Sequence, residues 1–163
     1  MARNVLFLCT GNSARSLMAE ALLGVLGAGR FNAFSAGSRP TGRVQPHAAE
    51  LATALGYPAD RLRSKAWDEF AVPGAPQMDL VITVCDDAAG EACPVWPGHP
   101  ARAHWGVPDP AAVPGDEDAR RAAYRTAFAT LRRRVERLLA LPADALDGFA
   151  AASALRQIAE QTR

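Results

Sequence analysis

An apolar run that ends directly in a cysteine constrains the fold of this chain more than any other segment. Val5–Leu8 is short and continuously hydrophobic, as in a strand that is buried on both faces. Cys9 follows at once, a short polar stretch ends at Arg15, and a helical pattern begins at Leu17–Leu26. A buried strand that enters a helix through a tight loop is typical of a parallel α/β sheet.

The residue types of this loop suit a tetrahedral oxyanion held beside a thiol. Backbone amides at a helix N-terminus can converge on an anion, and the planar fork of Arg15 can bind two of its oxygens. A helix N-terminus and nearby cations lower a cysteine pKa from ~8.5. We therefore expect Cys9 to be largely thiolate at neutral pH, although a buried core cysteine is the alternative. The predicted oxyanion-binding residues are Thr10, Gly11, Asn12, Ser13, Ala14, Arg15 and Ser16.

Length, charge and cysteine content limit the classes of protein to consider. The chain has 163 residues, enough for one domain, and its formal net charge of +1 argues against a general nucleic-acid or membrane-surface binder. No apolar run approaches the ~18 residues of a membrane span, and Val5–Leu8 is too short for a secretory signal. We expect a cytoplasmic monomer whose three cysteines stay reduced.

Strand and helix patterns alternate along the rest of the chain, and Gly56 is expected to end the second helix. The pattern predicts an α/β, single-domain, three-layer fold: a four-stranded parallel sheet with helices on both faces. Ligands bind beyond the carboxyl ends of such strands, where Cys9, Cys85 and Asp109 all fall. The expected elements are strands Val5–Leu8, Phe31–Ser35, Leu80–Val84 and Ala103–Trp105, and helices Leu17–Leu26, Gln45–Leu55, Asp118–Leu141 and one more, on the surface, after Pro142.

A cluster of arginines lies on the long predicted helix. Arg132, Arg133, Arg134 and Arg137 fall mostly opposite its apolar face and are interspersed with Glu136. We interpret the cluster as a solvated face rather than a binding surface.

Taken together, these motifs resemble the low-molecular-weight tyrosine phosphatase superfamily, whose signature is Cys, five residues, Arg, Ser. The version found here, with Met18-Ala19-Glu20 after it, is most similar to the arsenate reductase branch. The resemblance implies a single phosphatase-like arsenate reductase domain with a core over about residues 4–140 and a C-terminal helical extension over about 142–163. Further matches, in the family's order, are Ser35-Ala36-Gly37, Val81–Cys85, Cys93-Pro94, His104-Trp105-Gly106 and Asp109-Pro110.

The resemblance implies reduction of arsenate to arsenite, in arsenic detoxification, by a relay of three thiols. Cys9 attacks arsenate, Cys85 attacks Cys9 and releases arsenite, and Cys93 attacks Cys85 to leave a Cys85–Cys93 disulfide. No tightly bound cofactor is implied. An external dithiol closes the cycle, with thioredoxin expected and glutaredoxin or a low-molecular-weight thiol as alternatives. If residues 86–92 are helical, they hold Cys85 and Cys93 ~12 Å apart along the axis, so we expect them to unwind on oxidation.

Asp109 is the predicted general acid. It would protonate the hydroxyl that leaves arsenate, or a phenolate in a phosphatase, whereas a turn or helix-start aspartate is the alternative. Ala111–Val113 lacks the aromatic residues usual at this point in phosphatases of the superfamily. A phosphatase of tyrosine or small phosphate esters, acting through a phosphocysteine, is therefore the second hypothesis, and residual phosphatase activity is compatible with the first. The third is a non-catalytic thiol sensor or arsenic-binding protein, which would need neither Arg15 nor Asp109.

A cation site beside the loop is the last feature that the resemblance implies. Some relatives bind potassium through residues that match Asn12, Glu20 and Ser35, together with an aspartate that is missing around Lys65. We expect the Lys65 ammonium to take the place of the cation, with Glu20 as its partner, although an exposed lysine is the alternative.

A zinc site is a weaker interpretation of the same region. Cys85, Cys93, His99 and His104 supply suitable ligands. Their spacing is wider than the two to four residues that usually separate the first pair of ligands of a structural zinc. We predict no metal site.

Overall fold

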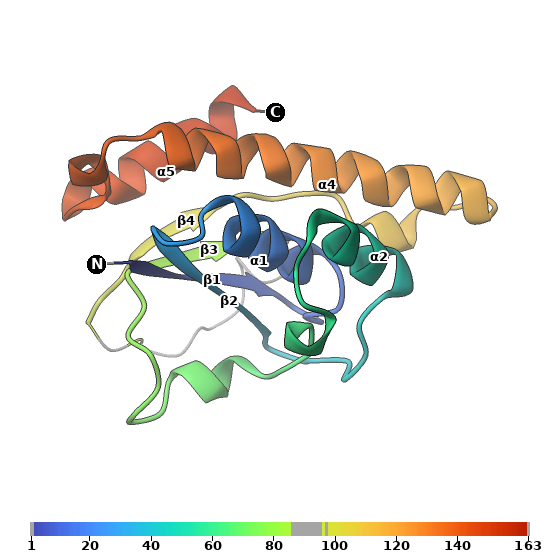
Figure 1. The fold of residues 1–163 in the computed structure, drawn as a ribbon, viewed down its shortest axis with the longest axis horizontal. Helices are drawn as coiled ribbons and strands as arrows, with labels where there is room; N and C mark the ends of the chain where they lie inside the picture. The colour runs from blue at the N-terminus through green and yellow to red at the C-terminus, as the bar shows by residue number, and fades with distance from the viewer. Residues whose placement is uncertain (1, 86–95, 97, 163) are drawn as a thin grey trace.

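Four parallel strands form the centre of the molecule in the computed structural model, which describes residues 2–85, 96 and 98–162 (Figure 1). Their spatial order is β2-β1-β3-β4, and every neighbouring pair is parallel. This confirms the predicted α/β sheet. Cys93 and the predicted helical segment 86–92 lie outside the described residues. The strands are β1 (Arg3–Cys9), β2 (Phe31–Gly37), β3 (Leu80–Thr83) and β4 (Ala101–His104).

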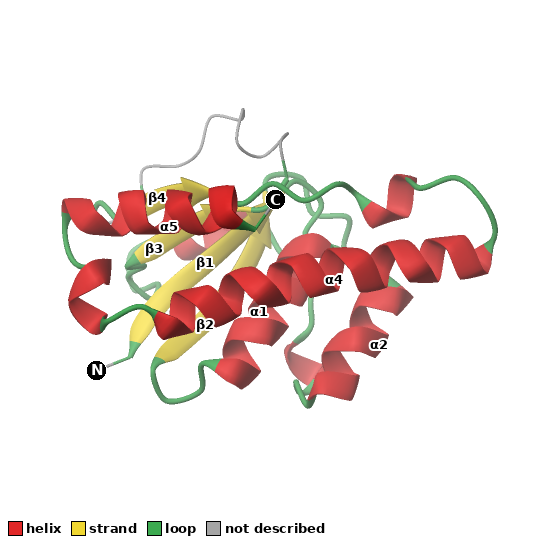
Figure 2. Ribbon diagram, turned by 90° about the horizontal axis from the view of Figure 1, so that it is seen from above, coloured by secondary structure: helices red, strands yellow, loops and turns green. Residues whose placement is uncertain are grey.

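One face of the sheet is covered by helices, which lie above it in Figure 1. Alternate residues of β1 project to this side, where Val5 and Phe7 join one cluster with buried residues of α1, α4 and α5. In Figure 2 the helix α4 crosses the layer as its longest element. The helices are α1 (Arg15–Leu26), α2 (Pro46–Leu55), α4 (Glu117–Ala140) and α5 (Phe149–Gln161).

The other face of the sheet carries a second cluster. Leu6 and Leu8 of β1 pack there with Phe70, Met78 and Trp96. Within the described part of the chain, the regular element of this layer is the 3-10 turn Trp67–Phe70. Two prolines and a glycine follow the turn closely, at positions 73, 74 and 76, and they prevent its continuation as an α-helix.

The predicted element boundaries are close to the observed ones. Gly56 ends α2 as predicted, with φ 110° and an amide that donates to carbonyls of the last turn. The edge strand β4 begins at Ala101 rather than Ala103, because its residues are only alternately part-buried and its apolar pattern is weak. No helix in the described ranges is long and apolar enough to cross a membrane.

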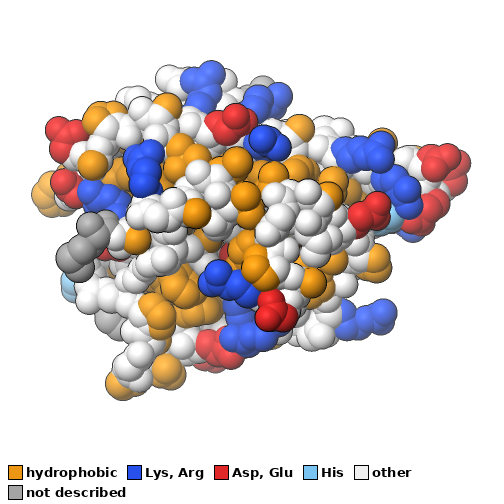
Figure 3. All heavy atoms as spheres, in the orientation of Figure 1, with side chains coloured by type: hydrophobic (Ala, Val, Ile, Leu, Met, Phe, Trp, Pro, Cys, Tyr) orange, Lys and Arg blue, Asp and Glu red, His pale blue; other side chains and the backbone are white. Residues whose placement is uncertain are grey.

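The arginine cluster of α4 is not uniformly solvated, which corrects the prediction. Arg132, Arg133 and Arg137 are exposed, and basic and acidic side chains are interspersed over the face seen in Figure 3. Arg134, in contrast, is only 5% exposed. It lies three residues after buried Leu131 and four before buried Leu138, so it falls within the apolar stripe of the helix.

The helix α5 is integrated into the core and does not merely lie on the surface as predicted, because Ala151, Leu155 and Ile158 form a buried apolar stripe. This packing leads to a first prediction. Replacing the fully buried Leu155 by Ala should lower the free energy of unfolding by about 2–5 kcal/mol, because it leaves a cavity between α5 and the sheet. Phe149→Ala, on the same helix but fully exposed, should change it by less than ~0.5 kcal/mol. Urea unfolding measures both. Equal effects of the two substitutions would contradict this packing.

Candidate active site

The carboxyl ends of β1 and β3 bring two thiols together. Cys9 is the last residue of β1, and Cys85 lies two residues beyond β3, the neighbouring strand. Both cysteines are free and buried, and a side-chain hydrogen bond joins them. The backbone amide of Thr10 also donates to the Cys85 sulfur, at 3.3 Å. The parallel sheet therefore places the two thiols in contact although they are far apart in sequence.

The loop after Cys9 is shaped by Asn12. This residue has φ 45°, in the left-handed region that asparagine tolerates, and its side chain is fully buried. Its amide nitrogen donates to Ser16 at 2.8 Å and to Ser35 at 3.0 Å, and its oxygen accepts from the Lys65 backbone at 2.9 Å. Across the described residues, the backbone amides at positions 12–15 have no hydrogen-bond partner. Those open donors precede the first turn of α1, which suits an anion.

Gly37 allows β2 to approach this loop. A Cβ atom on Gly37 would lie 2.4 Å from the Thr10 carbonyl oxygen and 2.9 Å from that of Cys9, both of them backbone atoms. No side chain fits in this space. Gly37 matches the family pattern in sequence, but only the structure gives this reason for a glycine.

The Cys9 thiol is not the readily ionised group that the loop sequence predicts. Its hydrogen bond with Cys85 and its burial both raise the pKa of Cys9, whereas Arg15 lowers it and the Gly11 amide lowers it further. The raising effects dominate in this arrangement. The prediction from the helix N-terminus is wrong here because the second thiol and burial were not visible in a local sequence pattern.

Arg15 joins the anion loop to the loop after β4. Its Nη1 donates to the Val107 carbonyl at 2.9 Å, and its Nη2 lies 3.8 Å from Oδ2 of Asp109. The Arg15 side chain is 15% exposed and that of Asp109 is 44% exposed. The two predicted site residues therefore meet at an open edge of the site.

Asp109 also has the structural role that the sequence left open as an alternative. It precedes the 3-10 turn Pro110–Ala112, and its Oδ1 accepts from the Ala111 amide at 3.0 Å. The other carboxylate oxygen faces Arg15. The same carboxylate caps a turn and faces the anion loop, so the role of Asp109 in the turn is compatible with its predicted role as general acid.

A buried charged network lies beneath the loop. Lys65 Nζ is 3.6 Å from Oε1 of Glu20 and donates to Ser35 at 3.2 Å, and Ser35 in turn donates to Glu20 at 2.6 Å. Burial lowers the pKa of Lys65, and the Glu20 carboxylate opposes this effect. The alternative of an exposed lysine is wrong, since Lys65 is only 7% exposed.

Tyr57 completes this network and was not found from the sequence. Its hydroxyl donates to Oε2 of Glu20, and the residue is buried. Burial and the Glu20 charge both raise the pKa of Tyr57, so the hydroxyl stays protonated and keeps donating. A tyrosine just after the glycine that ends α2 carries no local signal of this contact.

No metal site is formed by the described residues. None of them form a group of three or more His, Cys, Asp or Glu side chains that could hold a metal ion. Two members of the possible zinc set are also far apart in the fold, because Cys85 follows the carboxyl end of β3 whereas His99 precedes the amino end of β4. His104 lies 2.7 Å from Thr83, within the sheet.

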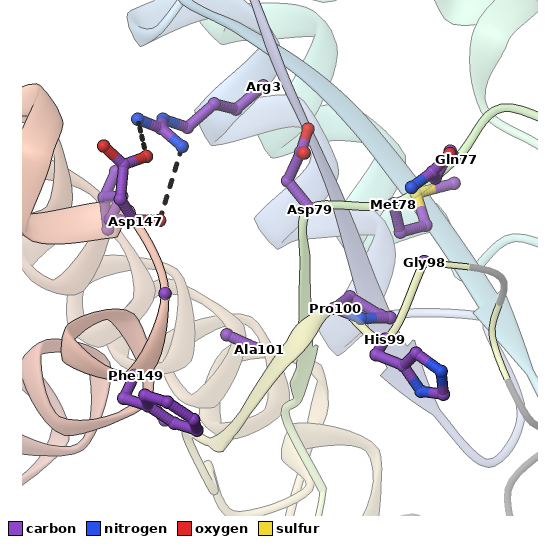
Figure 4. Close-up of a pocket in the computed structure, with 13 residues that line it drawn as sticks. Arg3, Gln77, Met78, Asp79, Gly98, His99, Pro100, Ala101, Asp147 and Phe149 are labelled. Carbon is purple, nitrogen blue, oxygen red and sulfur yellow. Dashed lines mark hydrogen bonds and ion pairs between the residues drawn. The ribbon is translucent and has the colours of Figure 1, made fainter.

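A cavity of about 560 Å³ lies at the amino edge of the sheet, remote from the two thiols (Figure 4). Its charged side chains are engaged in the fold. Arg3 pairs with Asp147 at 2.8 Å, and Asp79 accepts from the Asn4 amide at 2.7 Å. These contacts hold the start of β1 against the start of β3 and against the turn that precedes α5.

Known proteins are similar to this chain in sequence and in fold. The family described as Low molecular weight phosphotyrosine protein phosphatase matches residues 4–147. The chain belongs to this family. Among its members, the arsenate reductase of Bacillus licheniformis is 36% identical over 135 residues, which cover 83% of this chain and 94% of that protein.

Solved structures of the family agree with this assignment. An arsenate reductase from Archaeoglobus fulgidus is 31% identical, with a TM-score of 0.65 over 84% of this chain and 99% of that one. An arsenate reductase in the phosphate binding state is 28% identical, with a TM-score of 0.65 over 85% of this chain and 97% of that one. The family match ends at residue 147, so α5 lies beyond it.

The contact between the thiols leads to a prediction on pH dependence. Cys85→Ala removes the largest effect that raises the pKa of Cys9. A lower pKa gives a larger thiolate fraction at a fixed pH, and the thiolate is the reactive form. Iodoacetamide should therefore modify Cys9 faster at neutral pH in Cys85→Ala than in the wild type, as followed by peptide mass spectrometry. Cys85→Ser, which retains a hydrogen-bonding group, should fall between them, and an unchanged rate in Cys85→Ala would contradict the assignment.

Proposed function

We propose that this chain reduces arsenate to arsenite with its own thiols. The observation that carries the proposal is the contact of Cys9 with Cys85 at an oxyanion loop, where the Cys85 sulfur also accepts from the Thr10 amide at 3.3 Å. A phosphatase needs one nucleophilic thiol, whereas a two-electron reduction needs a second sulfur within reach of the first. Relatives named as arsenate reductases, one of them in a phosphate binding state, support the choice of oxyanion.

The first proposed step is attack of the Cys9 thiolate on arsenic. A sulfur–arsenic bond forms and one arsenate oxygen leaves as water. The substrate dianion accepts hydrogen bonds from the open amides at positions 12–15 and from Arg15, whose guanidinium also lowers the pKa of Cys9. Asp109 supplies the proton to the departing oxygen, since its Oδ2 lies beside Arg15 at the edge of the site.

The next two steps move the electrons. The Cys85 thiolate attacks the Cys9 sulfur, so a Cys9–Cys85 disulfide forms while the sulfur–arsenic bond breaks and arsenite leaves with the electron pair. Cys93 then attacks Cys85, which releases Cys9 and leaves a Cys85–Cys93 disulfide. An external dithiol reduces that disulfide and is itself oxidised. We propose thioredoxin for this role and a cytoplasmic, monomeric enzyme without a tightly bound cofactor.

Lys65 is proposed to replace a bound potassium ion beneath the loop. Its ammonium contacts Ser35 and Glu20, two of the residues that match the cation site of relatives, and its backbone holds Asn12, the third. The buried carboxylate of Glu20 is thus balanced by a covalently attached cation. Asn12, Glu20 and Ser35 then act through the loop and do not bind a metal.

The relay predicts different products for two cysteine variants. With thioredoxin, thioredoxin reductase and NADPH, the wild type should turn over arsenate steadily. Cys93→Ser should form at most one arsenite per protein molecule, because Cys9 stays in the Cys9–Cys85 disulfide, and Cys85→Ser should form none. Arsenite is counted directly, alongside NADPH oxidation. Steady arsenite release by Cys93→Ser would refute the relay, and hydrolysis of phosphate esters unaffected by either variant, without any arsenate reduction, would favour the phosphatase.

The position of the Lys65 ammonium beside Glu20 predicts that arsenate turnover does not depend on potassium. Wild-type rates should be the same in potassium chloride and sodium chloride, because the site is already occupied by an ammonium. Lys65→Ala should become dependent on potassium, since it leaves Glu20 buried without its cation. Arg63→Ala is the control, because the Arg63 side chain pairs with Glu69 at the surface and only its backbone contacts Lys65. Strong stimulation of the wild type by potassium would contradict the proposal.

A further inference from the structure

Arg134 is a buried guanidinium that the proposed reaction does not use. It lies in the middle of α4 with 5% of its surface exposed, and no acidic side chain within the described part of the chain pairs with it. Burial lowers the pKa of Arg134, as expected when a cation is desolvated without a carboxylate, but a guanidinium stays charged in proteins. Such a group is costly to keep in a core unless its hydrogen bonds are satisfied.

The hydrogen bonds of Arg134 are directed at one short segment. Its Nη1 donates to the carbonyl of Trp105 at 2.8 Å and to that of Gly106 at 3.2 Å. Its Nε donates to the hydroxyl of Thr162 at 3.0 Å, at the end of α5. The planar fork of an arginine thus spans two successive carbonyls on one side and α5 on the other.

The segment held by Arg134 leads directly to Asp109. The amides of Trp105 and Val107 donate to Thr83 and Val84, at the end of β3. The Val107 carbonyl accepts from Arg15 at 2.9 Å, and Asp109 follows two residues later, 3.8 Å from the same guanidinium. The backbone of residues 105–107 is therefore fixed by the sheet on its amide side and by two arginines on its carbonyl side.

Trp105 links this segment to α5 by a second hydrogen bond. Its ring is fully buried against Phe7, with centroids 6.2 Å apart, and its Nε1 donates to the Leu155 carbonyl at 2.9 Å. Leu155 and Thr162 both lie beyond residue 147, where the family match ends. The C-terminal extension thus contacts the segment directly, through the hydrogen bond of Trp105 to Leu155. It also contacts the segment indirectly, because Thr162 accepts from Arg134 and Arg134 donates to the carbonyl of Trp105.

We propose that Arg134 is a positioning residue that fixes residues 105–109, and that α5 completes this function by holding Arg134 through Thr162. The charge of Arg134 keeps two carbonyls oriented at the point where the chain leaves β4. The distance between Asp109 and the Arg15 guanidinium is then fixed, although this edge of the site is open to solvent. The effect on rate rests on the proposed acid role of Asp109, whereas the effect on the backbone does not.

The test compares two arginines that both join α4 to α5. Arg134→Met should lower kcat for arsenate roughly 10- to 100-fold with a smaller effect on KM, because a displaced acid acts in the chemical step. Arg137→Met removes a contact with Gln161 at 3.0 Å at the surface of the same two helices, and it should leave kcat unchanged. Thr162→Val, a milder change of similar shape, should lower kcat in the same direction as Arg134→Met.

A double-mutant cycle separates positioning from general destabilisation. In an Asp109→Asn background, Arg134→Met should have little further effect on kcat, since the acid it positions is already absent. An equal loss of kcat in both backgrounds would overturn the proposal. Amide hydrogen exchange needs no turnover, and at Trp105 and Val107, whose amides donate to the end of β3, it should accelerate in Arg134→Met and not in Arg137→Met. Unchanged exchange would also overturn it, whereas accelerated exchange in a protein that fails to reduce arsenate would refute only the proposed function.

Discussion

The buried side-chain amide of Asn12 is the contact on which the rest of the site depends. It links the loop after β1 to Ser16 in α1, Ser35 in β2 and the backbone of Lys65, so that three separate parts of the chain fix one backbone conformation. A buried amide without these partners would be costly, and a fully satisfied polar network favours a single arrangement. The left-handed backbone of Asn12 is thereby maintained, and the backbone amides at positions 12–15 stay open for an anion.

The charges beneath the loop are balanced before any substrate binds. Glu20 is almost fully buried and accepts hydrogen bonds from Tyr57 and Ser35, with the Lys65 ammonium 3.6 Å away. An uncompensated carboxylate at this depth would oppose binding of a second anion above it. With Glu20 neutralised, the open amides and Arg15 determine the potential that an oxyanion meets. The network therefore serves the site without contacting the substrate.

Sequence patterns predicted the local parts of this structure well. The strand–loop–helix from Val5 to Leu26, the end of α2 at Gly56 and the parallel sheet follow from apolar periodicity and turn residues, which act over a few positions. Long-range contacts were less accessible. Tyr57 contacts Glu20, and Gly37 approaches the loop after Cys9, across more than 20 residues of sequence. A tyrosine or a glycine occurs in many other settings, so neither residue type predicts such a contact.

The sequence by itself determined that a cysteine, an arginine and a helix N-terminus meet in one loop, because all three lie within eight consecutive residues. Only the tertiary structure decided how these groups behave. Pairing of β1 with β3 brings Cys85 against Cys9 and raises its pKa, and helix packing buries Arg134 among apolar residues. The physical reason is that pKa values and the roles of charged side chains depend on burial and on neighbours across the sheet, which a linear pattern does not contain.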